Sequence, residues 1–165
     1  MNFRFGFTLV EILVAIGLLA VIGTSTSVLL MTSLRGARKA TAIAMVKNEA
    51  EFAQSAMGQM VRYAKSITSC SATKLDIVRL NGDDVSYQLT GGVIASSSSK
   101  LSEAINLTSD RVAVSGCTGT MFSCSGNVVN VCFTANAAKG IDVTDTAGSG
   151  GIKFDSSITL RNAAN

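Results

Sequence analysis

Glu11 is the most conspicuous ionisable residue in the chain because it stands near the start of a long apolar segment. From Phe7 to Leu34 it is the one ionisable residue, and its neighbours are apolar or small and hydroxylic. A carboxylate in the hydrocarbon of a bilayer costs roughly 2.5–3.5 kcal/mol on insertion scales, so it needs a cationic partner or a function. The chemistry that Glu11 offers is ion pairing with a partner cation.

Four cysteines form a second set of residues, which could form disulfides or bind a metal. They lie beyond the apolar segment, at Cys70, Cys117, Cys124 and Cys132, and the chain has no histidine. An even number of cysteines in this region favours two disulfides, for which three pairings are possible. We favour Cys117 with Cys124, which closes a short loop, and Cys70 with Cys132, which ties the end of a helix to a strand. The alternatives are a four-thiolate zinc site, which no short Cys-x-x-Cys spacing supports, and four free buried thiols.

The sequence offers no catalytic constellation. Without histidine there is no Ser-His-Asp or Cys-His arrangement. Asp83-Asp84 lies in a segment of turn composition, and Gly148–Gly151 lacks the lysine of a phosphate-binding loop. The net charge of +3 is too small and too scattered to indicate a nucleic-acid partner. We therefore expect a non-enzymatic protein with no cofactor and no metal.

The apolar segment itself is long enough to cross a membrane. Residues 7–34 exceed the ~20 residues that a helix needs to span the hydrocarbon core. A cleaved secretory signal is the alternative, and Ser25 and Ser27 are small residues of the kind its peptidase accepts. An acid so early in the apolar region fits such a signal poorly.

The start of the chain resembles the precursors of type IV pilin-like proteins. Those precursors carry a short basic leader ending in glycine, then Phe-Thr-Leu, a glutamate and a hydrophobic helix, and the matching residues here are Arg4-Phe5-Gly6-Phe7-Thr8-Leu9-Val10-Glu11. The resemblance implies that a prepilin peptidase cuts between Gly6 and Phe7 and that the new amine of Phe7 is methylated. It also implies that this amine pairs with Glu11 of a neighbouring subunit during assembly.

Topology is a point where the charge count and the resemblance disagree. Arg35, Arg38, Lys39 and Lys47 follow the span, whereas Arg4 and the initial amine precede it, so the count places the globular part in the cytoplasm. The resemblance implies the opposite orientation. Long translocated domains largely override the count, and the cysteines suit an oxidising compartment. We expect a single pass through the cytoplasmic membrane with the head outside.

Beyond the span, apolar residues recur three and four positions apart, which predicts an amphipathic helix. They are Ile43, Val46, Ala50, Ala53, Met57, Met60, Ala64 and Ile67. The chain has no proline, so we predict one helix from about Thr8 to about Ile67. Its weak point would be Gly23–Ser27, although ordinary interfacial polarity explains that composition equally well.

After Ser69 short alternating runs separated by turn residues predict strands. Residues 75–80, 85–90 and 93–94 read as a three-stranded meander with turns at Asn81–Asp84 and Gly91-Gly92. Further strands are expected at 111–114, 127–134 and 152–161. The Ser-rich stretch 96–99 and the Gly-rich stretch 148–151 are predicted to be flexible loops.

These elements predict an α+β fold, in which a long N-terminal helix packs against a C-terminal antiparallel sheet. The expected parts are a leader at 1–6, a transmembrane and filament-core helix at 7–34, its amphipathic continuation at 35–68, and a β-rich globular head at 69–165. Two stretches resemble minor pilins and the minor pseudopilins of type II secretion: Tyr87–Gly92 and Ile158–Asn162. This resemblance is less specific than that of the N-terminus, and a major pilin subunit is the alternative.

We therefore expect a structural subunit of a type IV pilus or of a type II secretion pseudopilus. Its expected partners are the prepilin peptidase, other pilin subunits and the platform protein of the assembly machine. The alternatives are a binding module at a pilus tip, for adhesion or DNA uptake, and an uncleaved membrane-anchored protein.

Overall fold

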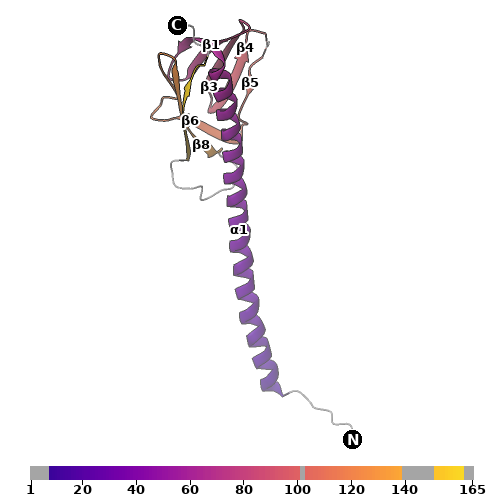
Figure 1. Cartoon of the computed structure of the whole chain (residues 1–165). Coiled ribbons are helices and arrows are strands. Elements are labelled where there is room, and N and C mark those ends of the chain that lie inside the picture. The colour runs from indigo at the N-terminus through magenta and orange to yellow at the C-terminus, as the bar shows by residue number, and fades with distance from the viewer. Residues whose placement is uncertain (1–7, 101–102, 139–150, 162–165) are drawn as a thin grey trace. The chain divides into compact units, whose positions relative to one another are not determined.

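A computed structural model describes residues 8–100, 103–138 and 151–161 of the chain. It contains one long helix followed by nine strands (Figure 1). The helix is α1 (Leu9–Arg62), and the strands are β1 (Ala64–Cys70), β2 (Lys74–Arg79), β3 (Asp84–Thr90), β4 (Val93–Ser98), β5 (Ile105–Asn106), β6 (Val112–Gly116), β7 (Phe122–Ser125), β8 (Val128–Ala137) and β9 (Ile152–Thr159).

Helix α1 continues without a break through the predicted weak point at Gly23–Ser27. The hydroxyl groups there donate to backbone carbonyls three or four residues earlier; Ser25 Oγ, for example, lies 2.8 Å from the Val21 oxygen. Thr24, Thr26, Ser27 and Thr32 do the same. Each polar side chain is thus satisfied by its own helix, which suits a helix in an apolar environment.

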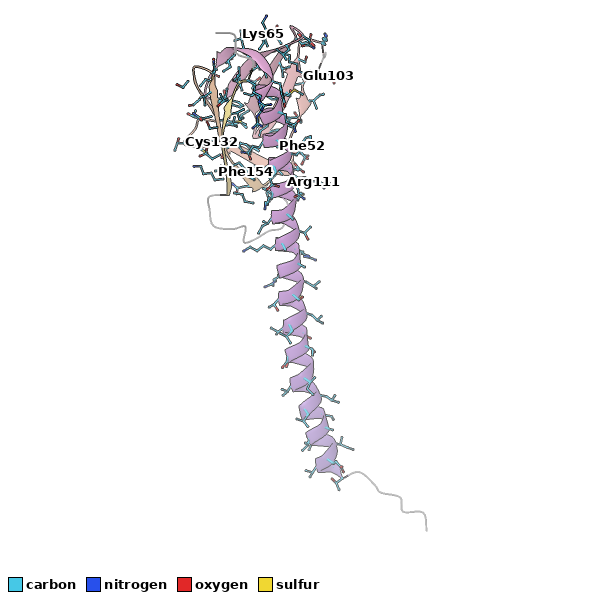
Figure 2. All side chains as sticks on the ribbon, viewed as in Figure 1. Phe52, Lys65, Glu103, Arg111, Cys132 and Phe154 are labelled. Atoms are coloured by element: carbon cyan, nitrogen blue, oxygen red, sulfur yellow. A yellow bond between two sulfur atoms is a disulfide. The ribbon has the colours of Figure 1, made fainter. Side chains whose placement is uncertain are left out.

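The chain divides into two compact units after Ala40. In the first unit the described residues belong almost entirely to α1, and their side chains point to all sides (Figure 2). The large apolar side chains from Leu9 to Leu34 are 50–76% exposed. This helix is long and apolar enough to cross a membrane. A helix that is apolar all round needs an apolar solvent or protein neighbours.

The second unit, Thr41–Asn165, contains two antiparallel sheets rather than the single sheet predicted. The first sheet has the order β1-β2-β3-β4-β5. In the second sheet β8 is central, because β6 and β7 pair with its two ends along one edge and β9 pairs along the other. Hydrogen bonds join the sheets directly: the Val114 N–H donates to the Gly92 oxygen at 2.7 Å.

The last five turns of α1 contribute one buried face to the core of this unit. That face consists of Ala42, Val46, Ala50, Ala53, Met57 and Val61. The predicted apolar face is therefore right from Val46 to Met57 and wrong at Met60, whose side chain is 39% exposed. The sheets supply the rest of the core, including the stacked rings of Phe133 and Phe154, whose centroids lie 5.2 Å apart.

The helix ends at Arg62 and not near Ile67, because the next residues form β1 and pair with β2. Strands β1, β5 and β7 were not predicted. The predicted loop at 96–99 is also wrong, since Ser96–Ser98 pair with β3 as part of β4. The predicted meander is confirmed as β2-β3-β4, and its turns use glycines at positive φ: Gly82, Gly91 and Gly92. Residues 148–150 lie outside the described residues.

Candidate functional site

The N-terminus of α1 places Glu11 in a helix cap. The Glu11 N–H donates to Thr8 Oγ1 at 3.3 Å and to the Thr8 carbonyl oxygen at 3.1 Å. Thr8 is therefore the N-cap and Glu11 the third helical residue, which is the spacing of a capping box. A carboxylate in the first turn also interacts favourably with the helix dipole. The Thr-x-x-Glu spacing is the sequence signal for this structural role of Glu11.

The charge of Glu11 has no counter-charge among the residues that the structure describes. The Glu11 side chain is exposed, and the next basic residue along the helix is Arg35. At 1.5 Å per residue Arg35 lies about 36 Å farther along the helix axis. A cation that pairs with Glu11 must come from outside this helix segment. The predicted cleavage site, Gly6 and Phe7, lies outside the described residues.

The cysteines form two disulfides, but the predicted pairing is wrong. Cys70 of β1 is bonded to Cys124 of β7, with Cα atoms 6.3 Å apart and a sequence separation of 54. Cys117 is bonded to Cys132 of β8, with Cα atoms 5.5 Å apart and a separation of 15. The first bridge joins the two sheets, and the second joins the turn between β6 and β7 to the central strand.

The register of the second sheet explains why Cys117 and Cys124 do not pair. Cys124 lies opposite Val129, whose side chain is fully buried, and Cys124 packs against the core. Cys117 lies beside Cys132, to whose carbonyl its N–H donates at 3.3 Å. Positions 129 and 132 of β8 point to opposite faces and lie about 10 Å apart. Cys124 and Cys117, which lie next to these two positions, are held apart by a similar distance. A disulfide needs Cα atoms roughly 4.4–6.8 Å apart, so these two cysteines cannot pair.

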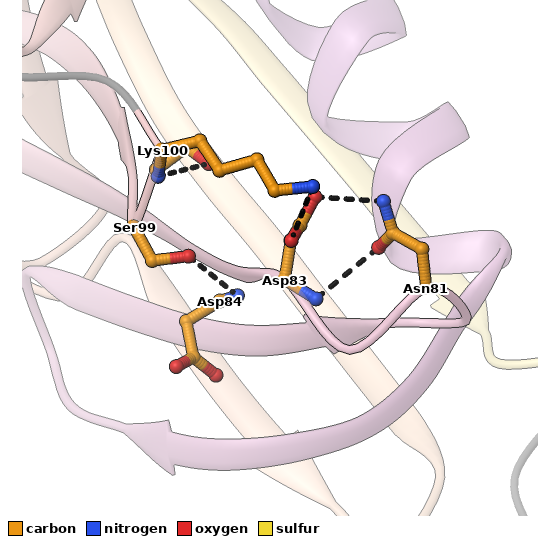
Figure 3. Close-up of polar contacts among 6 residues, drawn as sticks. Asn81, Asp83, Asp84, Ser99 and Lys100 are labelled. Atoms are coloured by element: carbon orange, nitrogen blue, oxygen red, sulfur yellow. Dashed lines mark hydrogen bonds and ion pairs between the residues drawn. The ribbon is translucent and has the colours of Figure 1, made fainter.

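The turn between β2 and β3 is held by a polar network, drawn in Figure 3. The Asp83 carboxylate binds the Lys100 ammonium at 2.9 Å and accepts from Asn81 Nδ2 at 2.7 Å. Its hydrogen bond with Lys100 is the main reason that the pKa of Asp83 is lowered. The Asp84 N–H donates to Ser99 Oγ at 3.3 Å. The network accounts for the predicted structural use of Asp83-Asp84.

Two further polar groups serve the packing of the second unit. The Glu49 carboxylate on α1 accepts from both the N–H and the hydroxyl of Ser109, each at 2.9 Å, and so ties the segment after β5 to the helix. Burial raises the pKa of Tyr87 to about 12, so that its hydroxyl stays protonated in the core. Among the described residues no cluster of three His, Cys, Asp or Glu side chains could hold a metal ion.

Comparison with known proteins agrees with the N-terminal pattern. The family model described as the prokaryotic N-terminal methylation motif matches residues 1–27. Searches of curated proteins and of solved structures found no match to this chain.

The matched region includes both Gly6-Phe7 and Glu11, and the described residues have the α+β architecture that the predicted elements indicated: one long N-terminal helix, apolar at its start, packed against antiparallel sheets. The chain therefore carries the N-terminal methylation motif of type IV pilin-like precursors on a pilin-like α+β fold.

Proposed function

We propose that this protein is a minor pilin or minor pseudopilin, a structural subunit that assembles through its N-terminal helix into a type IV pilus or a type II secretion pseudopilus. Cleavage after Gly6 removes the leader, residues 1–6, and methylation follows on Phe7. Before assembly, the precursor resides in the cytoplasmic membrane, with residues 41–165 on the extracytoplasmic side. A platform membrane protein and neighbouring subunits are its partners.

The observation that carries this proposal is Glu11, a carboxylate without a described counter-charge on a helix that is apolar all round. The amine of Phe7 on a neighbouring subunit is the cation that the motif supplies. Pairing the two charges offsets the cost of burying either one by itself. The exposed apolar side chains from Leu9 to Leu34 then find protein neighbours in the filament in place of lipid.

Processing is tested at Gly6. Mass spectrometry of the N-terminal peptide from membranes should find a methylated Phe7 at the start of the mature chain. Gly6→Leu should leave the leader attached, because a bulky side chain would then precede the cleaved bond. A parent chain that keeps Met1, or that is cut near Ser27, would contradict the proposal.

Assembly is tested at Glu11 with a pair of variants that separate its charge from its capping role. Glu11→Gln removes the charge and keeps a side chain that fits a capping box, so membrane insertion should persist while recruitment into sheared filaments falls. Thr8→Ala weakens the cap by about 1 kcal/mol and keeps the charge, so recruitment should persist. If Glu11→Gln enters filaments as well as the parent, the carboxylate has no role in assembly.

A further inference from the structure

Three cations gather on α1 directly after the apolar segment ends at Leu34. We call Arg35, Arg38 and Lys39 the basic cluster. Their spacing of three and four residues places them on one side of the helix, where they are neighbours. Arg35 and Arg38 are exposed and Lys39 is half-buried.

No acid neutralises this cluster within the described part of the chain. The sequence has no Asp or Glu between Glu11 and Glu49, and none of the three cations takes part in an ion pair that joins described residues. Lys47, about two to three turns farther along α1, provides a contrast because its Nζ lies 3.7 Å from Glu51 Oε1. Among the described residues, the basic cluster therefore carries an uncompensated positive charge where the apolar helix ends.

We infer that the basic cluster binds the phosphate groups of anionic phospholipids and so sets the depth at which Glu11 sits in the membrane. This inference rests on the proposed membrane anchoring, but not on assembly. A helix that leaves the hydrocarbon at Leu34 carries the next residues straight into the headgroup layer. Basic residues in that layer gain from nearby anionic lipids, and their long side chains reach the phosphates.

The apolar segment is longer than the hydrocarbon core is thick, so its position along the membrane normal is not fixed by its length alone. From Leu9 to Leu34 the helix is about 39 Å long at 1.5 Å per residue. The hydrocarbon core is only ~30 Å thick, which ~20 helical residues span. The surplus of about 9 Å must therefore project from one end, unless the helix tilts.

If the basic cluster lies among the lipid phosphates, the surplus length of the helix projects from the membrane at its N-terminal end. Counting ~20 residues back from Leu34 reaches Ala15. Glu11 then lies about 6 Å beyond the hydrocarbon, in the opposite headgroup layer. In that layer the Glu11 carboxylate stays hydrated and avoids the free-energy cost of a charge in the bilayer interior. A helix without the cluster could slide and draw Glu11 into the hydrocarbon.

An acidic protein is the other anion that the cluster could meet. The position of the three cations favours lipid, because they follow the end of the apolar segment at Leu34 within about one and a half turns. Headgroups surround a spanning helix at that level whether or not a partner protein is present. The lipid hypothesis also requires no particular orientation, provided that the leaflet around the cluster contains anionic lipid.

The experiment uses the full chain reconstituted into vesicles of phosphatidylcholine, with or without phosphatidylglycerol. Flotation first checks that the chain is inserted. The chain has no tryptophan, so a single one introduced by Leu13→Trp reports the depth of the Glu11 end. A second single reporter, Leu34→Trp, reports which lipid surrounds the cluster. Brominated lipids quench both reporters, with bromine either at defined depths or on one headgroup class.

In the mixed vesicles, we expect shallow bromines to quench the reporter at position 13 most strongly. The reporter at position 34 should prefer brominated phosphatidylglycerol. Replacing all three cations, Arg35→Gln, Arg38→Gln and Lys39→Gln, should move the first reporter deeper. Each cation removed should lower the relative association constant of phosphatidylglycerol up to about fivefold, the equivalent of ~1 kcal/mol. Lys47→Gln, the matched control, should leave both readouts unchanged.

Equal quenching by the two lipids at position 34 of the parent would overturn the inference and leave an acidic protein as the partner. An unchanged depth at position 13 in the triple variant would also overturn it, since the surplus length would then be absorbed by tilt. A chain that does not float with vesicles would refute the membrane anchoring itself, which is a different failure.

Discussion

Removing the Cys70–Cys124 disulfide should destabilise the second unit more than removing Cys117–Cys132, because the first closes a much longer loop. The separations are 54 and 15 residues. With the chain-entropy relation, these loops correspond to about 4 and about 3 kcal/mol at 25 °C. The expected difference between the two variants is therefore about 1 kcal/mol.

Two double variants make the comparison: Cys70→Ala with Cys124→Ala, and Cys117→Ala with Cys132→Ala. Alanine adds no polar group to the partly buried sites. The free energy of unfolding is measured by urea titration of the full chain in detergent, with brief proteolysis to count the unfolded fraction. The same variants test the pairing, because each should retain one intact disulfide and offer no thiol to an alkylating reagent in denaturant.

Either of two results would refute this reasoning. Alkylatable thiols in the freshly isolated double variants would mean that the assigned pairs are wrong. A larger loss of stability on removal of Cys117–Cys132 would mean that loop length does not govern the contribution of the bridges. Reduction of the parent serves as the control and should cost more than either double variant.

Three further predictions concern packing and charge in the second unit. Met57→Ala should cost about 2–5 kcal/mol of unfolding free energy in the same urea titration, because it empties a fully buried site, and Met60→Ala should cost far less. Glu49→Gln should cost about 1–3 kcal/mol, since an amide nitrogen cannot accept one of the two hydrogen bonds from Ser109; an unchanged midpoint would show that this contact is dispensable. The pKa of Asp83 is lower in the folded state than in the unfolded state, where it is about 3.9. The ionised carboxylate therefore stabilises the fold above the unfolded pKa, and this stabilisation is lost as the pH falls through the folded pKa. Asp83→Asn should therefore lower the stability at neutral pH, and the difference from the parent should vanish in acid titrations.

The long helix and the meander could be predicted from sequence because their signals are local. A long apolar run without proline indicates a continuous helix whatever the chain does later. The spacing from Val46 to Met57 identified the buried face, and Gly82, Gly91 and Gly92 marked the turns of the meander. Each of these features depends on residues that are close together in the chain.

The errors arose where distant residues decide the structure. Ala64 and Ile67 continue the helical spacing, yet pairing with β2 places them in a strand. Ser96–Ser98 have a weak preference for strands and become one because β3 lies beside them. The disulfide pairing depends on which face of β8 each cysteine joins, and that face is set by the register of β7 and β8.

The Cys70–Cys124 bridge also determines how the protein would respond to mechanical load. A pull between α1 and β9 enters the sheets through β1 and meets Cys70 within eight residues of the end of the helix. From there the covalent path crosses directly to Cys124. The 54-residue separation between them would otherwise release about 190 Å of chain at roughly 3.5 Å per residue. Even when the sheets separate under tension, an oxidised subunit can lengthen only by the segments that lie outside the Cys70–Cys124 loop.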